Sequence, residues 1–175
     1  ENVPQLMDFN ESSIFQDFCN ELAEMGYKYS YSVVFCPDYG IPQRRRRLVL
    51  LASTLGEISI LPKTHTPDNY VTVRDVISSL PPIESGEICV TDPLHRARQL
   101  SPLNIKRIQA TKEGGSWRDW PDELVLDCFK KDSGRTYGSV YGRMKWNEPA
   151  PTMTTQCTGL GNGRFGHPEQ DRAIS

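Results

Sequence analysis

The sequence predicts an α/β fold over residues 1–53, followed by a loop-rich second lobe. Before Ser53, a helix pattern, a strand pattern, a turn and a second strand pattern follow one another, which is the order of an α/β sheet. After Ser53, prolines and glycines become frequent and the expected elements become short. We therefore expect a domain boundary near residue 54.

The helix of the first part is expected directly after residue 13. Ser13-Ile14-Phe15-Gln16 fits a capping box. Ile14, Phe18 and Leu22 then recur at the spacing of one helical face. Gly26 predicts the end of this helix, because glycine is favoured just past a helix C-terminus.

Two strands are expected to follow, over residues 29–35 and 47–52. The first segment alternates apolar and small polar side chains, and the second is a continuous apolar run typical of a buried strand. Residues 36–42 between them are rich in proline and glycine, which predicts a turn.

Short helices separated by loops are expected in the second lobe. Thr72 is expected to cap a small helix that ends at Pro81-Pro82, and Ser101-Pro102 predicts the start of another, which Gly114-Gly115 would end. Residues 137–166 are rich in glycine and threonine and predict loops and short strands. Two aromatic residues are expected in the core of the lobe rather than as platforms for base stacking: Trp117 and Trp120.

The composition predicts a globular chain without a membrane span or a metal site. Of 175 residues, 37% are hydrophobic, and no apolar run approaches the ~20 residues of a membrane helix. The five cysteines form no Cys-x-x-Cys pair, and the three histidines lack metal-ligand spacing, so they are expected to be structural. This cysteine usage favours a reducing, cytoplasmic setting.

The most informative feature is the run of four arginines at 44–47. The net charge of −2 argues weakly against a nucleic-acid binder, but a local patch decides phosphate binding, not the average. The run lies between a Gly-Ile-Pro turn and an apolar strand, so its guanidinium groups are expected to have fixed directions. Such groups suit bidentate recognition of phosphates or base edges.

The chain resembles the DNA (cytosine-5)-methyltransferases, and the resemblance extends over essentially its whole length. It rests on Glu1-Asn2-Val3, on Gln43-Arg44-Arg45-Arg46-Arg47 after Tyr39-Gly40-Ile41-Pro42, and on Trp146 to Thr155 followed by Gly163-Arg164-Phe165-Gly166-His167-Pro168. The stretch from His95 to Pro121 is similar to a bacterial branch of the family.

The resemblance implies catalytic roles for Glu1, Arg45 and Arg47. In the family, a cysteine thiolate attacks C6 of a flipped cytosine, and C5 then takes the methyl group of S-adenosylmethionine. Glu1 would donate a hydrogen bond to N3, provided that burial raises its pKa. Arg47, with Arg45 beside it, would stabilise negative charge at O2.

Strand alternation would place Gln43, Arg45 and Arg47 on the face toward the flipped base, with Arg44 and Arg46 on the opposite face. Thr152, followed by Met153, resembles a family threonine that contacts the DNA backbone. Basic residues near it are either phosphate contacts or ordinary surface charges. The predicted DNA-binding residues are Gln43, Arg143, Lys145, Thr152, Thr154 and Arg164.

The chain also departs from the family pattern. The Pro-Cys segment that carries the nucleophile and the glycine-rich S-adenosylmethionine loop lie upstream of Glu-Asn-Val in the family, and neither occurs here. We therefore expect a fragment that holds no cofactor contacts and cannot methylate DNA alone. The missing remainder of the enzyme, or a second chain, would complete it.

The resemblance implies a domain plan and a function. Residues 1–53 would belong to a Rossmann-like catalytic sheet, 54–151 to a target-recognition domain, and 152–175 to a segment that returns to the catalytic domain. The intact enzyme would methylate C5 of cytosine in a specific double-stranded DNA sequence, in a bacterial restriction–modification system. Two alternatives stay open: a non-catalytic DNA-binding module, and an RNA cytosine methyltransferase of the same family.

Overall fold

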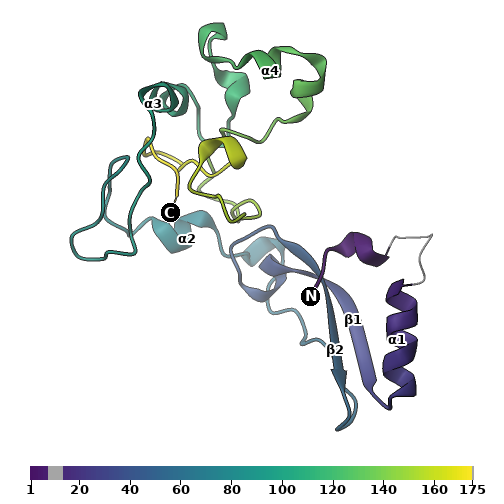
Figure 1. Cartoon of the computed structure of the whole chain (residues 1–175). Coiled ribbons are helices and arrows are strands. Elements are labelled where there is room, and N and C mark those ends of the chain that lie inside the picture. The colour runs from purple at the N-terminus through teal and green to yellow at the C-terminus, as the bar shows by residue number, and fades with distance from the viewer. Residues whose placement is uncertain (8–13, 175) are drawn as a thin grey trace. The chain divides into compact units, whose positions relative to one another are not determined.

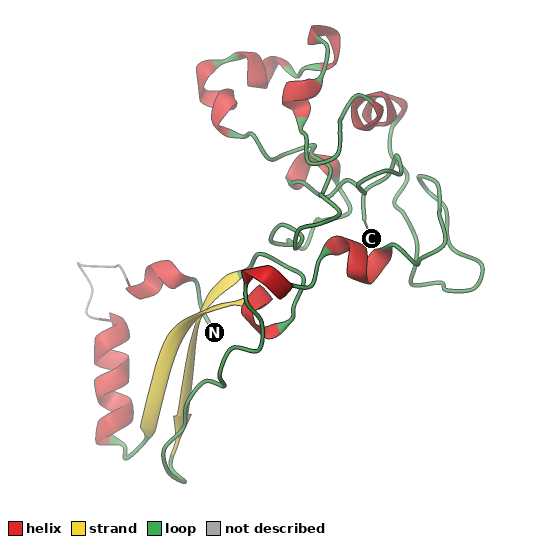
Figure 2. Cartoon of the chain, turned by 180° about the vertical axis from the view of Figure 1, so that it is seen from behind, coloured by secondary structure: helices red, strands yellow, loops and turns green. Residues whose placement is uncertain are grey.

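The structure is a computed structural model that describes residues 1–7 and 14–174. Two compact units are present, Glu1–Tyr70 and Val71–Ser175. The first combines helices with a small sheet, and the second consists of short helices joined by loops (Figures 1 and 2). The predicted mixture of helix and strand is confirmed. The predicted functional ranges 1–53, 54–151 and 152–175 stay predictions, because compactness does not assign a function.

The first unit is built on an antiparallel hairpin. Strand β1 spans Lys28–Phe35 and strand β2 spans Arg46–Ser53, with Val33 opposite Leu48 and Val34 opposite Arg47. The two predicted strands are confirmed within one residue at each end. Backbone hydrogen bonds of 2.8 Å in both directions between Asn2 and Leu48 add the start of the chain to the other edge of β2.

Helix α1 spans Ile14–Glu24 and lies along the hairpin (Figure 1). Gly26 ends it with a φ of 83°, and the Tyr27 amide donates to the Leu22 carbonyl at 2.9 Å, a typical helix C-terminal closure. The predicted helix and its glycine end are confirmed. The predicted capping residue, Ser13, lies outside the described residues.

Helix α1 covers the face of the hairpin that carries Leu48 and Leu50. The Phe15 ring meets the Tyr31 ring edge-on, with centroids 4.9 Å apart, and Tyr31 is the cross-strand partner of Leu50. Because side chains alternate along a strand, Arg47 points to the opposite face. Helix α1 therefore does not cover the Arg47 face of β2.

The predicted turn between the strands contains a 3-10 helix at Cys36–Tyr39. Gly40 follows it with a φ of 77°, a conformation that glycine adopts without strain. A side chain at this position would also meet the His65 ring, since a Cβ built on Gly40 lies 2.8 Å from His65 Cε1. The turn prediction is confirmed.

The described residues of the second unit form three short α-helices: α2 (Val73–Ile77), α3 (Pro102–Gln109) and α4 (Asp127–Lys130). Thr72 caps α2 and Ser101 caps α3, as predicted. The predicted end of the second helix at Gly114-Gly115 was wrong. Helix α3 ends at Gln109, where the Thr111 amide makes a tighter bond to the Ile108 carbonyl at 3.0 Å and the Arg143 guanidinium takes up the Ile108 and Thr111 carbonyls.

The core of the second unit joins segments that lie far apart in sequence. One buried cluster contains Val73, Met144, Trp146 and Ala150, and a second contains Leu100, Ile108, Leu160 and Ala173. Trp117 and Trp120 are 8% and 6% exposed, which confirms them as core residues. In the described part of residues 137–175, pairing is limited to isolated bridges such as Arg143 with Gly166, so the expected short strands are single bridges. Among the described residues, no helix combines the length and the apolarity that crossing a membrane requires.

Candidate functional site

The arginine run lies partly in a turn and partly in β2. The Gln43 amide donates to the Ile41 carbonyl and the Arg45 amide donates to the Gln43 carbonyl, each at 2.7 Å. These two bonds across three residues make narrow turns, and β2 starts only at Arg46. The expectation that one strand holds the whole run was therefore wrong for residues 43–45.

Burial nevertheless alternates along the run. Gln43, Arg45 and Arg47 are half-buried, whereas Arg44 and Arg46 are exposed. The Arg46 guanidinium lies over the Phe35 ring, 4.3 Å from its centroid, on the face opposite to Arg47. This pattern agrees with two different faces, although the turns rather than a strand produce it at the first three positions.

Glu1 and Arg47 form an ion pair across neighbouring strands. Arg47 Nε lies 2.8 Å from Glu1 Oε1, and Arg47 Nη1 donates to the Arg46 carbonyl at 2.7 Å. Because Asn2 pairs with Leu48, Glu1 and Arg47 are diagonal neighbours on one sheet face, within reach of long side chains. The structure thus brings together two predicted catalytic residues that are distant in sequence.

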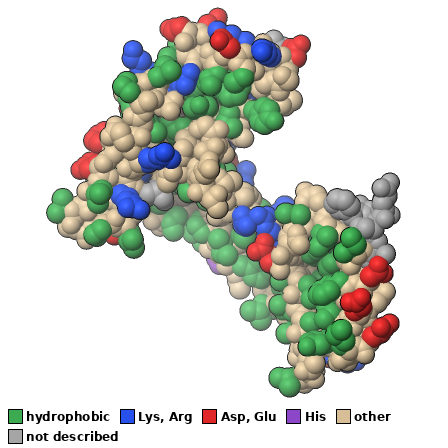
Figure 3. Space-filling view, in the orientation of Figure 1, with side chains coloured by type: hydrophobic (Ala, Val, Ile, Leu, Met, Phe, Trp, Pro, Cys, Tyr) green, Lys and Arg blue, Asp and Glu red, His purple; other side chains and the backbone are tan. Residues whose placement is uncertain are grey.

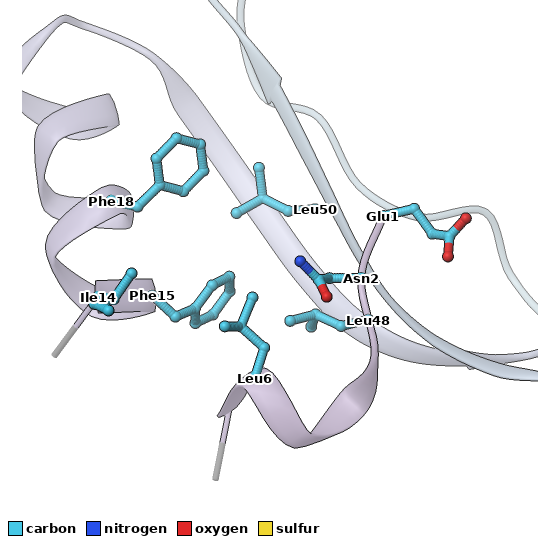
Figure 4. A pocket seen from close by; sticks show the side chains of 8 residues that line it. All are labelled: Glu1, Asn2, Leu6, Ile14, Phe15, Phe18, Leu48 and Leu50. Carbon is cyan, nitrogen blue, oxygen red and sulfur yellow. The ribbon is translucent and has the colours of Figure 1, made fainter. Parts of the chain in front are cut away.

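The Glu1 side chain is 56% exposed, against 23% for Arg47. The burial on which the predicted proton donation by Glu1 depends is therefore not provided by the described residues. The carboxylate points away from the apolar side chains of an adjacent pocket of about 310 Å³ (Figure 4). Leu6, Phe15, Phe18 and Leu50 are among the side chains that line this pocket.

A buried carboxylate supports the turn that precedes the arginines. Asp38 accepts the Tyr70 hydroxyl at 2.5 Å and pairs with Lys63 Nζ at 2.7 Å. Its carbonyl accepts the amides of Thr64 and His65 at 2.9 and 3.0 Å. The hydrogen bond from Lys63, followed by that from Tyr70, lowers the pKa of Asp38. Sequence reasoning missed this residue; the one local signal for it is an acid between a proline and an aromatic residue in the predicted turn.

Arg143 is an internal structural residue rather than a surface cation. It is 5% exposed, and its guanidinium donates to the carbonyls of Thr111, Ile108, His167 and Gln170 at 2.6–2.9 Å. It also pairs with Asp171. A guanidinium with all these partners is not available to a phosphate, which argues against the predicted DNA contact, and we assign Arg143 a structural role.

The other predicted contacts of the second unit lie nearer the surface. Lys145 Nζ is 2.6 Å from Glu148 Oε1, and its side chain is 48% exposed. Arg164 is half-buried, and its Nε has no hydrogen-bond partner among the described residues. Thr152 is half-buried and Thr154 is exposed. Their DNA contacts stay predictions.

His95 and His167 serve the packing of the second unit. His95 Nε2 lies 2.8 Å from the Pro81 carbonyl, and His167 Nδ1 accepts the amides of Glu169 and Gln170. Burial lowers the pKa of His167 to about 4, with help from nearby positive charge. In residues 1–7 and 14–174, no three potential ligands among His, Cys, Asp and Glu lie close enough to hold a metal ion.

Comparisons with known proteins agree on one family. The family model described as C-5 cytosine-specific DNA methylase matches residues 1–175. The chain is 58% identical over 175 residues to Type II methylase M.HgiDII of Herpetosiphon aurantiacus. It is 30% identical to Type II methyltransferase M1.BsuMI of Bacillus subtilis and 31% identical to DNA (cytosine-5)-methyltransferase 3 of Arabidopsis thaliana.

In each of these comparisons the whole chain is covered, but only part of the relative. The chain spans 49% of the Herpetosiphon protein, 39% of the Bacillus protein and 16% of the Arabidopsis protein. The residues described above therefore correspond to one portion of each relative.

Proposed function

The chain belongs to the C-5 cytosine-specific DNA methylase family, and on that premise we propose that the whole protein methylates C5 of cytosine in a specific duplex DNA sequence. Its resemblance to bacterial Type II methylases supports a place in a restriction–modification system. The observation that carries the proposal is the 2.8 Å ion pair between Glu1 and Arg47. These two residues are predicted to act on the same base, and the fold brings them together.

The geometry supports a role for Arg47 as a fixed cation. Its Nε is engaged by Glu1 and its Nη1 by the Arg46 carbonyl, so the guanidinium plane is held on the face of β2 that α1 does not cover. A pre-oriented cation stabilises charge as it develops on a base oxygen, since little reorganisation is needed during the reaction. We propose that Arg47 meets O2 of the flipped cytosine, with Arg45 beside it.

Glu1 has two proposed tasks in this scheme. It holds Arg47 in place, and it contacts N3 of the cytosine. A carboxyl must carry a proton to donate a hydrogen bond to N3, and burial favours the protonated form of a carboxyl. Further parts of the whole protein, together with the flipped base, would have to remove water from Glu1.

The fold and cofactor of the whole protein are proposals as well. We propose that the hairpin and α1 form one edge of a Rossmann-like catalytic sheet, and that the second unit contains the target-recognition domain, which would read base edges in the major groove. S-adenosylmethionine would supply the methyl group. The described residues contain no glycine-rich loop between a strand and a helix to hold it, so no contact to the cofactor is assigned to this chain. The expected setting is the bacterial cytoplasm.

Arg47→Ala in the whole protein tests the proposal, with Arg46→Ala as the matched control. Arg46 is the adjacent residue of β2 on the opposite face, so both variants remove one charge from the same element. Methyl transfer to duplex DNA, measured with labelled S-adenosylmethionine, should fall about 100–1000-fold in Arg47→Ala. Duplex affinity should stay within a few-fold, and the control should keep most activity.

Other outcomes would favour other functions. Equal loss of affinity and turnover in both variants would make the run a phosphate anchor. Binding of duplex DNA without any methyl transfer by the wild type would support a non-catalytic module. Preferential methylation of structured RNA would favour an RNA methyltransferase.

A further inference from the structure

A small hairpin in the second unit presents two arginines that the proposed chemistry does not use. The Ala97 amide donates to the Glu87 carbonyl at 2.8 Å and the Cys89 amide donates to the His95 carbonyl at 2.9 Å. Ile88 and Arg96 form the bridge between these bonds. The bonds and the bridge join residues 86–89 to residues 95–98, and we refer to the whole segment as the 86–98 hairpin.

The two faces of the 86–98 hairpin differ in character. Cys89 and Ala97 point inward, where they pack with Ile83, and all three are less than 9% exposed. Arg96 and Arg98 flank Ala97 and are both exposed, as alternation along an extended segment requires. The hairpin is therefore a one-sided element, with an apolar inner face and a basic outer face.

The outer face borders a hollow of about 350 Å³. Gly86, Ile88, Arg96 and Arg98 contribute to it from the hairpin, and Thr158 contributes from the loop after Thr152 and Thr154. The hollow thus lies between the hairpin and the segment for which DNA contacts are predicted. Basic and hydrophobic side chains lie side by side on the surface of this unit (Figure 3).

Neither arginine side chain has an internal partner. Within residues 1–7 and 14–174, no hydrogen bond, ion pair or ring contact engages the guanidinium of Arg96 or Arg98. The carboxylate of Glu87, on the opposite strand of the hairpin, accepts the Glu84 amide at 2.6 Å instead. Arg143 and Lys145 in the same unit both pair with acids, whereas the guanidinium groups of Arg96 and Arg98 are available to an external anion.

The hairpin is also anchored firmly enough to hold these charges in place. His95 Nε2 lies 2.8 Å from the Pro81 carbonyl on one side, and Ser85 Oγ accepts the Leu100 amide at 2.8 Å on the other. Arginines two residues apart on an extended segment have Cα atoms about 6.6 Å apart. Two such guanidinium groups can engage successive anionic groups of one strand, and duplex DNA is a dense row of phosphates.

We propose that Arg96 and Arg98 of the 86–98 hairpin bind backbone phosphates of the target duplex and position it against the loop that contains Thr158. The proposal rests on the proposed function as a DNA methylase. It assigns the hairpin a positioning role, so sequence readout would come from other residues of the unit.

The test compares the whole wild-type protein with the double variant Arg96→Ala/Arg98→Ala. Duplex affinity is measured from low to physiological salt on DNA with and without the methylation site, and turnover is measured at saturating DNA. The log–log salt slope should decrease by about 1.8, because each released phosphate contact contributes about 0.9. Affinity should fall at least about tenfold on both duplexes, the size expected for a lost charge-assisted contact. Turnover at saturating DNA should not change.

Two further variants sharpen the result. Lys106→Ala/Lys112→Ala removes two exposed charges from the same unit, outside the hollow, and should change the slope far less. Arg96→Lys/Arg98→Lys keeps the charge and should keep the slope. A loss confined to DNA with the methylation site would overturn the proposal in favour of base readout. An equal loss in Lys106→Ala/Lys112→Ala would show that binding follows only the net charge of the unit, and unchanged binding in Arg96→Ala/Arg98→Ala would rule the proposal out. Failure of the proposed function is distinguishable, because the wild type itself would then not methylate duplex DNA.

Discussion

Arg143→Ala should destabilise the second unit severely while leaving its surface unchanged. The substitution removes donors from four backbone carbonyls and leaves Asp171 without its partner. An unsatisfied buried group costs about 1–3 kcal/mol. The Asp171 side chain is 34% exposed, so the loss of its partner adds less than the about 3–5 kcal/mol of a fully buried ion pair. Water can enter and solvate some of these carbonyls, so we expect the free energy of unfolding to fall by about 4 kcal/mol, less than the sum of the individual costs.

The consequence is measurable as a fall in melting temperature of the whole protein by roughly 10 °C, taking about 2–4 °C per kcal/mol. Hydrogen exchange should show faster exchange of the amides in residues 108–111 and 167–172, which surround the guanidinium. Lys145→Ala is the matched control, since an exposed ion pair contributes at most about 1 kcal/mol.

One result would refute this reasoning. If Arg143→Ala melted like the Lys145→Ala control, but its salt slope for duplex binding decreased by about 0.9, Arg143 would be a phosphate contact. The sequence-based prediction would then be correct, and the internal hydrogen bonds would be dispensable.

Two other predictions concern pH and the turn before the arginines. His167 has a pKa of about 4 in the folded chain, chiefly because of burial, and about 6.5 when unfolded, so the unfolded state binds more protons between these values. The free energy of unfolding should therefore fall as pH drops from about 6.5 toward 4. His167→Gln should make this pH dependence weaker, as measured by urea unfolding followed by tryptophan fluorescence. The same pH dependence in the wild type and the variant would contradict this. Gly40→Ala should cost about 2 kcal/mol or more and Gly26→Ala about 1 kcal/mol, because both have positive φ but only Gly40 faces the His65 ring. If Gly40→Ala and Gly26→Ala unfolded at the same denaturant concentration, the contact with His65 would contribute nothing to the cost.

Local signals in the sequence predicted local structure well. The glycine that ends α1 and the caps Thr72 and Ser101 were found because each depends on a few neighbouring residues. The end of α3 was missed because a glycine pair downstream is a strong local signal, whereas the Arg143 guanidinium that takes up the carbonyls at this end comes from a distant part of the chain.

The predicted site was only partly recoverable for a related reason. Glu1 and Arg47 were named from their motifs, but their contact depends on the Asn2–Leu48 pairing, which joins segments far apart in the chain. Asp38 was overlooked because its partners Lys63 and Tyr70 lie 25 and 32 residues further along the chain.

The sequence by itself determined the family of the chain, the helix and the two strands of the first unit, and the identity of the arginine run. Motif residues and periodicity are properties of short stretches, so they can be recognised without coordinates. The tertiary structure decided which cations are internal and which are free. Arg143 and Arg96 are the same residue type, so the sequence alone does not distinguish them. Arg143 is enclosed by backbone carbonyls, whereas Arg96 is exposed to solvent. Burial and hydrogen-bond partners are supplied by distant residues, and they decide which charge can meet DNA.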